Sequence, residues 1–288
     1  MSEPRAADRG WRAYWGPVLR DQSAKRPPVV VLGLLIAMIT VFYVAGEQNR
    51  PGRTAMDMIY IPSSADKTAA WYRSLSAMFS HVSTTHLWMN AAMLLFLGSL
   101  FEFTEGVLHT LAVVWGAGNL GFALHGTYKP LVMVRGMSGA IYGIIFAQIS
   151  LLALNWAEMP LRWLRVILIL LLAGADAVTY FTTDTRGTSY EAHLFGALAG
   201  ISVALVMGRN VRFHHWELTF TWGGVVGFAA LIAVAFATAQ TWPAILSSAE
   251  LPFLIGYAAW LTRRVVMSHQ EATLTKQPLE GGESVQNV

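Results

Sequence analysis

The sequence contains no cysteine and carries little charge. Zero Cys in 288 residues exclude disulfides, thiolate-bound metals and a cysteine nucleophile. Asp, Glu, Lys and Arg make up only 13% of the chain, about half the share in a typical soluble domain, whereas hydrophobic residues make up 55%. A soluble protein of this size cannot bury that much apolar surface. The composition excludes soluble globular, collagen-like, disordered and nucleic-acid-binding chains, and it favours a membrane protein.

Hydrophobic stretches long enough to cross a bilayer recur along the chain. A membrane-spanning helix needs about 20 residues, and the pattern predicts an all-α, polytopic transmembrane helix bundle. The last stretch contains Ser247, Ser248 and Glu250, so it could instead lie at the membrane interface, which would leave seven spans rather than eight. The predicted spans are 29–46, 86–103, 107–125, 138–156, 163–182, 190–208, 219–239 and 243–262.

The basic residues fall unevenly between the segments that connect these spans. If the N-terminus is inside, the larger share of the 20 Lys and Arg residues lies in inner segments, as the positive-inside rule requires. We therefore expect both termini in the cytoplasm, an even number of spans, and a bacterial inner membrane as the location. The expected units are a leader with Trp11, Tyr14 and Trp15 (1–28), a six-span core (29–208), a C-terminal transmembrane hairpin (209–262) and a polar tail (263–288), disordered at its end.

Polar side chains occur near the beginning of three spans that all run from outside to inside. His81, His86 and Asn90 precede or begin the second span, Ser138 begins the fourth, and His193 lies near the start of the sixth. Because polar groups are costly in a bilayer, such residues are candidate functional sites. The shared direction of the three spans places these residues at a similar depth on the outer side, which is the geometric condition for one shared site.

The residue types fit an activated nucleophile. A serine hydroxyl becomes a good nucleophile when a nearby histidine accepts its proton. Gly136 and Gly139 flank Ser138 and would allow a tight turn that aims backbone N–H groups at a developing oxyanion. Tyr142, one turn later, could pack against an imidazole. The small-residue pairs Gly139/Gly143 and Gly196/Gly200 would let the fourth and sixth spans approach closely.

Each of these features also has a structural interpretation. Gly and Ser pack membrane helices well without any chemistry, and His86 and Asn90 could be hydrogen-bonding glue between helices. His193 could be a satisfied core histidine. Asp176 in the fifth span could be a proton relay, although a hydrogen-bonded packing acid is the simpler interpretation. Taken together at matched depth, the clusters favour a catalytic site.

The same residues, in this order and spacing, carry a family resemblance. The set HxxxxHxxxN (His81, His86, Asn90), GxSG around Ser138 and AHxxGxxxG from Ala192 resembles the rhomboid intramembrane serine proteases over roughly residues 70–208, and Glu102 matches the end of that family's second span. The resemblance implies a six-span core with an outward-opening, water-filled site and a Ser–His dyad without a third acidic residue. The implied roles are Ser138 as nucleophile, His193 as general base, and His86, Asn90 and the Ser138 N–H as oxyanion hole, with His81, Gly136, Gly139, Tyr142 (stacked on His193) and Gly196 in support.

The resulting hypothesis is an intramembrane serine endopeptidase that cleaves transmembrane segments of other proteins. It expects transmembrane substrates and lipid as partners, no nucleic acid, no metal and no cofactor, and it makes no prediction of oligomeric state. One alternative is a catalytically silent relative that binds and escorts membrane clients, against which the intact Ser138 and His193 argue. Another is a transporter, suggested by the number of spans and Asp176, but no inverted repeat is evident.

Overall fold

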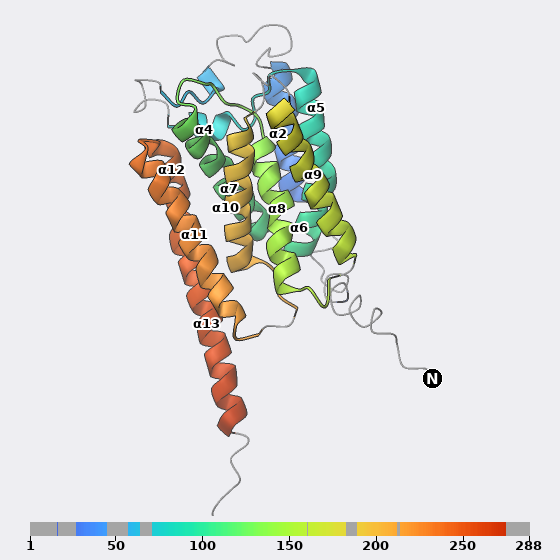
Figure 1. Cartoon of the computed structure of the whole chain (residues 1–288), viewed down its shortest axis with the longest axis vertical. Coiled ribbons are helices and arrows are strands. Elements are labelled where there is room, and N and C mark those ends of the chain that lie inside the picture. The colour runs from blue at the N-terminus through green and yellow to red at the C-terminus, as the bar shows by residue number, and fades with distance from the viewer. Residues whose placement is uncertain are drawn as a thin grey trace, which may run out of the picture.

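The computed structural model of the chain describes residues 16, 27–44, 57–63, 71–159, 161–182, 189–211 and 214–274. Within these residues the regular structure is helical, apart from one antiparallel bridge between Tyr60 and Val134. The predicted interfacial aromatics of the leader and the predicted disordered end of the tail lie outside the described residues. The fold is a polytopic helix bundle, as the sequence predicts (Figure 1).

The helices follow the predicted hydrophobic stretches. Six of the described helical segments are long and apolar enough to cross a membrane, and α2 and α8 are shorter apolar helices. The second span is one continuous segment in which α5 passes through a π-helical turn, η2, into α6. The bounds are α2 Val29–Val44, α4 Arg73–Ser76, α5 Thr84–Met93, η2 Leu94–Gly98, α6 Ser99–Glu105, α7 Val107–Tyr128, α8 Ser138–Leu154, α9 Arg162–Thr182, α10 Tyr190–Met207, α11 Glu217–Ala237, α12 Thr241–Ser248 and α13 Leu251–Leu274.

The last predicted span differs from a single straight helix. It consists of α12 and α13, which are separated by a turn at residues 249–250. Pro252 explains the break, because proline lacks an N–H to continue the preceding helix and is favoured in the first turn of a new one. The hydroxyls of Ser247 and Ser248 donate to carbonyls one turn back, at 2.8 and 2.7 Å, so these polar side chains are satisfied inside α12.

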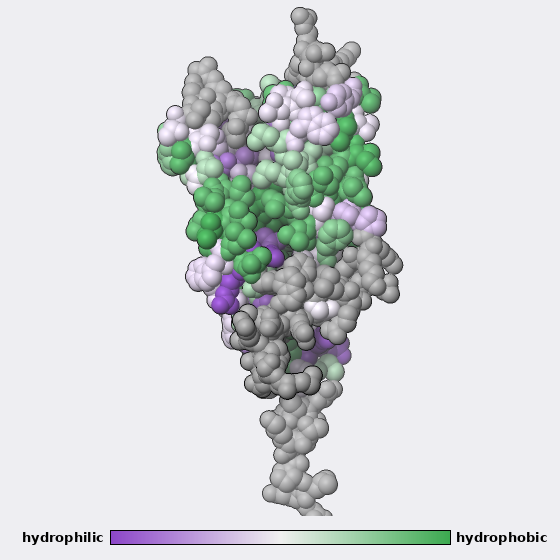
Figure 2. Space-filling view, turned by 90° about the vertical axis from the view of Figure 1, so that its right-hand side faces the viewer, coloured by the Kyte–Doolittle hydropathy of each residue, from purple (hydrophilic) through white to green (hydrophobic). Residues whose placement is uncertain are grey.

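The surface of the bundle is apolar around its middle. Figure 2 shows a broad band of hydrophobic side chains on the face in view, with polar side chains above and below it. Large apolar residues such as Phe96, Leu170 and Phe181 are between 65% and 82% exposed. Such a belt would make a soluble protein aggregate, whereas hydrocarbon chains of lipid solvate it. The protein is therefore an integral, multi-pass membrane protein.

The centre of the bundle is a close contact between α8 and α10, which α7 also packs against. A Cβ atom added at Gly196 would lie 2.2 Å from the carbonyl oxygen of Gly139, and one at Gly200 would lie 2.2 Å from that of Gly143. Backbones this close leave no space for side chains, which is the packing that small-residue pairs allow in membranes. The predicted contact between the fourth and sixth spans is confirmed.

Glu102 ties α2 to the second span. Its carboxylate accepts the backbone N–H groups of Val30 and Val31, both at 3.0 Å, in the first turn of α2. These N–H groups have no partner within their own helix, and the positive end of the helix dipole favours a carboxylate there. The acid that the family resemblance marks at position 102 thus fixes where the first span begins.

Helix α9 lies at the edge of the bundle, on the side away from α11 and α13 (Figure 1). All residues of α9 are described, and Ile169 is the one that is buried. Near its start, Arg165 donates to the side chain of Gln148 in α8 at 2.6 Å. Its other end reaches the candidate site, as described below.

Several helix ends meet around a cavity of about 880 Å³. Its lining includes Val29 at the start of α2, Glu105 at the end of α6, Arg209 just after α10, and Arg264 in α13. Since α10 ends at this cavity, its beginning lies at the opposite end of the bundle. The beginnings of α5, α8 and α10 therefore share that opposite end, as the alternation of spans predicts.

Candidate active site

Ser138 is the first residue of α8 and follows a tight turn. Gly136 has φ +112°, a conformation that side chains rarely adopt, and its N–H donates to Ala77 O at 2.8 Å. A Cβ at Gly136 would lie 2.7 Å from Cε1 of His86. Glycine is needed at 136 for two reasons, the backbone conformation and the imidazole ring that packs against it. The turn places half-buried Ser138 beside the beginning of α5.

Asn90 connects the two histidines that precede it. Its Nδ2 lies 3.1 Å from Nε2 of His81 and 3.2 Å from Nε2 of His86. An amide nitrogen can only donate, so both histidine Nε2 atoms accept, and the amide presents its N–H groups to the rings. The spacing of four residues between His86 and Asn90 puts them on one helix face, as predicted.

His81 holds this arrangement from just before α5. Its Nδ1 lies 3.1 Å from Phe79 O, so the ring donates there and accepts from Asn90 at the other nitrogen. Burial, together with the nearby ring of His86, lowers the pKa of His81 to about 3. The ring is therefore neutral near pH 7 and can serve as the acceptor that orients the amide of Asn90.

His193 is buried in the first turns of α10, where two contacts connect it with the start of α8. Its ring stacks on Tyr142, with centroids 4.1 Å apart and planes 9° apart, which is the stacking that the resemblance implies. A Cβ at Gly139 would lie 3.2 Å from the carbonyl oxygen of Ala192. The residue after Ser138 therefore packs against the residue before His193, so the two side chains project from adjoining backbones.

Asp176 is a member of this cluster that the sequence did not assign to it. Its Oδ2 lies 2.7 Å from Nδ1 of His193, and its carboxylate also accepts the hydroxyl of Tyr142. The two residues are 17 positions apart in the sequence. Asp176 lies near the end of α9 and His193 near the start of α10, so the sequence indicates that the two lie at similar depth, although depth alone does not determine that their side chains meet.

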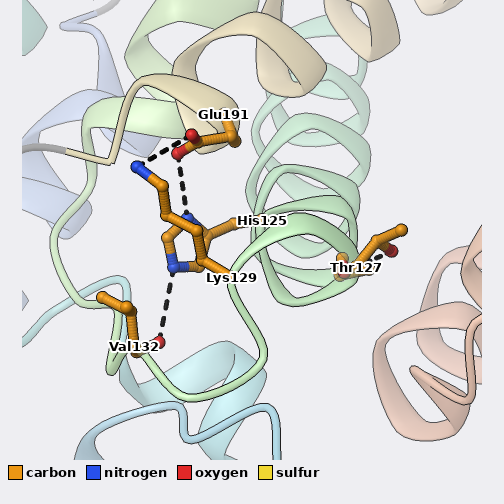
Figure 3. A network of polar contacts seen from close by, with 6 residues as sticks. His125, Thr127, Lys129, Val132 and Glu191 are labelled. Atoms are coloured by element: carbon orange, nitrogen blue, oxygen red, sulfur yellow. Dashed lines mark hydrogen bonds and ion pairs between the residues drawn. The ribbon is translucent and has the colours of Figure 1, made fainter.

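A second polar network fastens the beginning of α10 to the end of α7. In Figure 3, His125 and Lys129 point toward the carboxylate of Glu191. Lys129 Nζ lies 2.9 Å and His125 Nδ1 lies 3.4 Å from its oxygens, while the other ring nitrogen of His125 lies 3.4 Å from Val132 O. Because Glu191 precedes His193 by two residues, this network fixes the first turn of the helix that carries the histidine. The sequence pattern does not predict this network.

The structure places the residues predicted for the site in two adjoining groups at the same end of the bundle. One group, around the turn before Ser138, contains His81, His86 and Asn90; the other, on α8 and α10, contains Tyr142 and His193. His86 also lies close enough to His193 to interact with it electrostatically. Gly136, Gly139 and Gly196 make the close approaches described above. The chemical roles of these residues stay predictions.

Comparison with known proteins bears directly on this arrangement. The model of the rhomboid domain matches residues 68–210, which include all of the site residues above. The chain belongs to the rhomboid family. A rhomboid protein is an intramembrane protease or a catalytically inactive relative of one, and members of the family act on transmembrane substrates within the bilayer.

Curated rhomboid relatives come from animals, a fungus, a plant and Toxoplasma gondii. The chain is 28% identical to Rhomboid-related protein 1 of Caenorhabditis elegans over 209 residues, which cover 66% of this chain and 58% of that protein. It is 22% identical to Rhomboid-related protein 3 of Homo sapiens over 253 residues, which cover 81% and 60%. It is 26% identical to Rhomboid-type serine protease 2 of Emericella nidulans over 141 residues, which cover 49% and 27%. The match thus spans about three fifths of the length of the first two relatives.

Proposed function

We propose that the protein is an intramembrane serine endopeptidase in which Ser138 is the nucleophile and His193 the general base. The observation that carries the proposal is the close backbone contact between Gly139 in α8 and Ala192 in α10. Gly139 follows Ser138 directly, and Ala192 directly precedes His193. A nucleophile and its base must lie within hydrogen-bonding reach, about 3 Å in the reacting complex. A helix contact that admits no side chain is well suited to maintain that distance.

The proposed reaction follows from this geometry. Nε2 of His193 takes the proton of the Ser138 hydroxyl as Oγ attacks the scissile carbonyl, and the same nitrogen then gives the proton to the leaving amine. Water repeats the sequence on the acyl-enzyme and restores Ser138. Nδ1 of His193 is already engaged by Asp176, which leaves Nε2 as the nitrogen available for the proton transfer.

The oxyanion would form beside Asn90 and the Ser138 N–H. Both hydrogens on Nδ2 of Asn90 point at histidine nitrogens. The hydrogen bond to His81 is buried, whereas the one to His86 is partly buried. A carbonyl oxygen that becomes negative is a stronger acceptor than a neutral imidazole. We therefore propose that the oxyanion replaces the His86 nitrogen as the acceptor of that hydrogen, while His81 keeps the amide in place.

Substrates of such a site are transmembrane segments with a weak point. In an intact helix the scissile amide is hydrogen-bonded within the bilayer and cannot enter the site. Helix-breaking residues near the end of the segment that faces the site should therefore mark substrates.

The direct test uses the purified full-length protein in liposomes, together with a transmembrane substrate that contains a Gly or Pro near that end. Cleavage inside the span, mapped by mass spectrometry, is expected, whereas binding without cleavage would indicate a client-escorting pseudoprotease and contradict the proposal.

The oxyanion residues should give graded effects. Asn90→Ala removes a donor from the transition state but leaves Ser138 and His193 in place, so kcat should fall about 10²–10³-fold, as for single oxyanion donors in soluble serine proteases. Asn119→Ala is the matched control, because Asn119 is also a buried asparagine in a span but donates to Trp115 O in its own helix. Both kcat and thermal unfolding should be measured. Equal losses of stability with unchanged kcat in both variants would show that Asn90 stabilises helix packing and does not bind the oxyanion.

We also propose that the N-terminus faces the cytoplasm and the active-site end faces outside. The chain has no cysteine, so single cysteines can be probed with an impermeant thiol reagent without background. Lys129→Cys and Arg186→Cys should label in intact cells, whereas Glu158→Cys should label after permeabilisation. Labelling of positions 129 and 186 from opposite sides would separate Ser138 and His193 by about 30 Å of hydrocarbon and would contradict the proposed dyad. The bacterial inner membrane stays a prediction from sequence.

A further inference from the structure

Asp176 contacts the proposed general base, although the family resemblance implies a dyad with no acidic third member. Asp176 Oδ2 lies 2.7 Å from His193 Nδ1, which is the short distance of a charge-assisted hydrogen bond. The side chain of Asp176 is 27% exposed and that of His193 is 11% exposed, so the contact lies at the edge of the bundle and is not fully enclosed. The contact joins α9 to α10 directly at the site.

This contact determines which nitrogen of His193 carries a proton. A carboxylate can only accept, so a neutral His193 ring at 2.7 Å must donate through Nδ1–H. The opposite tautomer would point a nitrogen lone pair at a carboxylate oxygen. With the proton on Nδ1, the lone pair of Nε2 is free to receive the proton of Ser138.

The same carboxylate restricts the rotation of the ring. Tyr142 stacks on His193 at 4.1 Å and its hydroxyl donates to Asp176. Stacking alone fixes the plane of an imidazole but lets the ring flip over about its Cβ–Cγ bond, which exchanges the positions of its nitrogen and carbon atoms. The bond from Nδ1 to Asp176 removes this freedom, so the three side chains together define the direction in which Nε2 points.

A purely structural role explains Asp176 poorly. Its neighbours in α9, Ala175 and Ala177, are exposed, and a Cβ added at Gly174 would meet nothing within 4 Å. This stretch of α9 therefore contributes little packing. An acid at such a place in a membrane span is costly unless it has a partner or a function. The partner here is the proposed general base.

We propose that Asp176 is a positioning residue that holds His193 in the Nδ1–H tautomer and stabilises its imidazolium form, so that the site works as a Ser–His–Asp triad assembled from α8, α10 and α9. This inference rests on the proposed function, in which His193 is the base. During attack the proton of Ser138 moves to Nε2, the ring becomes positive, and the carboxylate of Asp176 compensates that charge without taking up a proton itself.

The test compares Asp176→Asn and Asp176→Glu with wild type in the full-length protein. In soluble triad proteases the Asn variant loses about 10⁴-fold in kcat; because the contact of Asp176 is not fully enclosed, we expect a loss of about 10²–10³-fold, with KM little changed. Asp176→Glu keeps the charge and should restore part of the activity. Thr179→Val is the matched control and should keep wild-type turnover, because Thr179 lies one turn away and its hydroxyl donates to Ala175 O within α9.

A spectroscopic measurement separates positioning from general stability. Nitrogen NMR of ¹⁵N-histidine-labelled protein, with His193 assigned by substitution, should show the proton on Nδ1 in wild type and a shift of population toward Nε2–H in Asp176→Asn. Unchanged kcat in Asp176→Asn beside an active wild type, or a wild-type ring protonated on Nε2, would overturn this inference and leave the proposed function intact. A wild-type chain that neither cleaves nor reacts at Ser138 would overturn both.

Discussion

Replacing Ser138 or His193 by alanine should abolish cleavage while the protein still inserts and folds. Ser138→Ala removes the atom that forms the acyl bond, and His193→Ala removes the base that accepts its proton. The closest α8–α10 contact is formed by glycines, so both variants should still fold, although His193→Ala also removes the stacking of His193 on Tyr142. Turnover of a transmembrane substrate in liposomes should fall to the level without enzyme in both variants, and the thermal unfolding midpoint of Ser138→Ala should stay near that of wild type.

The double variant sharpens this prediction. Residues that act as one catalytic unit give strongly non-additive losses, so Ser138→Ala combined with His193→Ala should be no slower than either single variant. Tyr128→Phe serves as a control with a similar change in size, because Tyr128 packs on Phe195 at the same end of α10 but outside the proposed machinery. Residual cleavage above background in Ser138→Ala, or additive losses in the double variant, would contradict the dyad.

The second large effect is on folding. In Gly200→Ala the new Cβ would lie 2.2 Å from the carbonyl oxygen and 2.5 Å from the Cα atom of Gly143. Both atoms belong to backbone, so α8 and α10 must move apart. We expect a loss of stability at the upper end of the 1–3 kcal/mol typical of overpacking, about 3 kcal/mol or more. Activity should fall further, because a displacement of about 1 Å at a catalytic pair can cost 10²-fold in rate.

Gly223→Ala is the matched control for this substitution. Gly223 also lies within a span, in α11, but a Cβ there would meet nothing within 4 Å. Alanine favours a helix over glycine by about 1 kcal/mol, so this variant should be neutral or slightly more stable. Unfolding of the two variants in detergent, followed by circular dichroism, measures the difference. Equal stability of Gly200→Ala and wild type would show that the α8–α10 contact is looser than the structure indicates.

The sequence predicted the helices and much of the site because both depend on local patterns. Hydrophobic length identifies spans, since every backbone polar group in lipid must be bonded within a helix. The distribution of Lys and Arg then places His86, Ser138 and His193 at one end. The spacing of Gly139, Gly143, Gly196 and Gly200 indicates which spans touch. These signals are strong in membrane proteins because the lipid bilayer itself imposes them.

The contacts of Asp176 and Glu191 could not be predicted in the same way. Each depends on how far one helix is rotated relative to its neighbour, which hydrophobic length does not specify. Asp176 lies in a span with a broad exposed apolar surface, so its sequence environment resembles that of a packing acid. The ion pair between Glu191 and Lys129 depends on the residue that follows α7 lying close to the beginning of α10. The turn between α12 and α13 was also missed, although Pro252 marks it.

The most direct measurement of the central claim is labelling with a serine-directed fluorophosphonate. Such a reagent reacts with a serine hydroxyl only where a neighbouring base activates it. The proposal predicts one covalent adduct on wild-type protein, mapped by mass spectrometry to the peptide containing Ser138, which disappears in Ser138→Ala and in His193→Ala. Absence of labelling in folded wild-type protein, or an adduct that persists in Ser138→Ala, would contradict the assignment of Ser138 as an activated nucleophile.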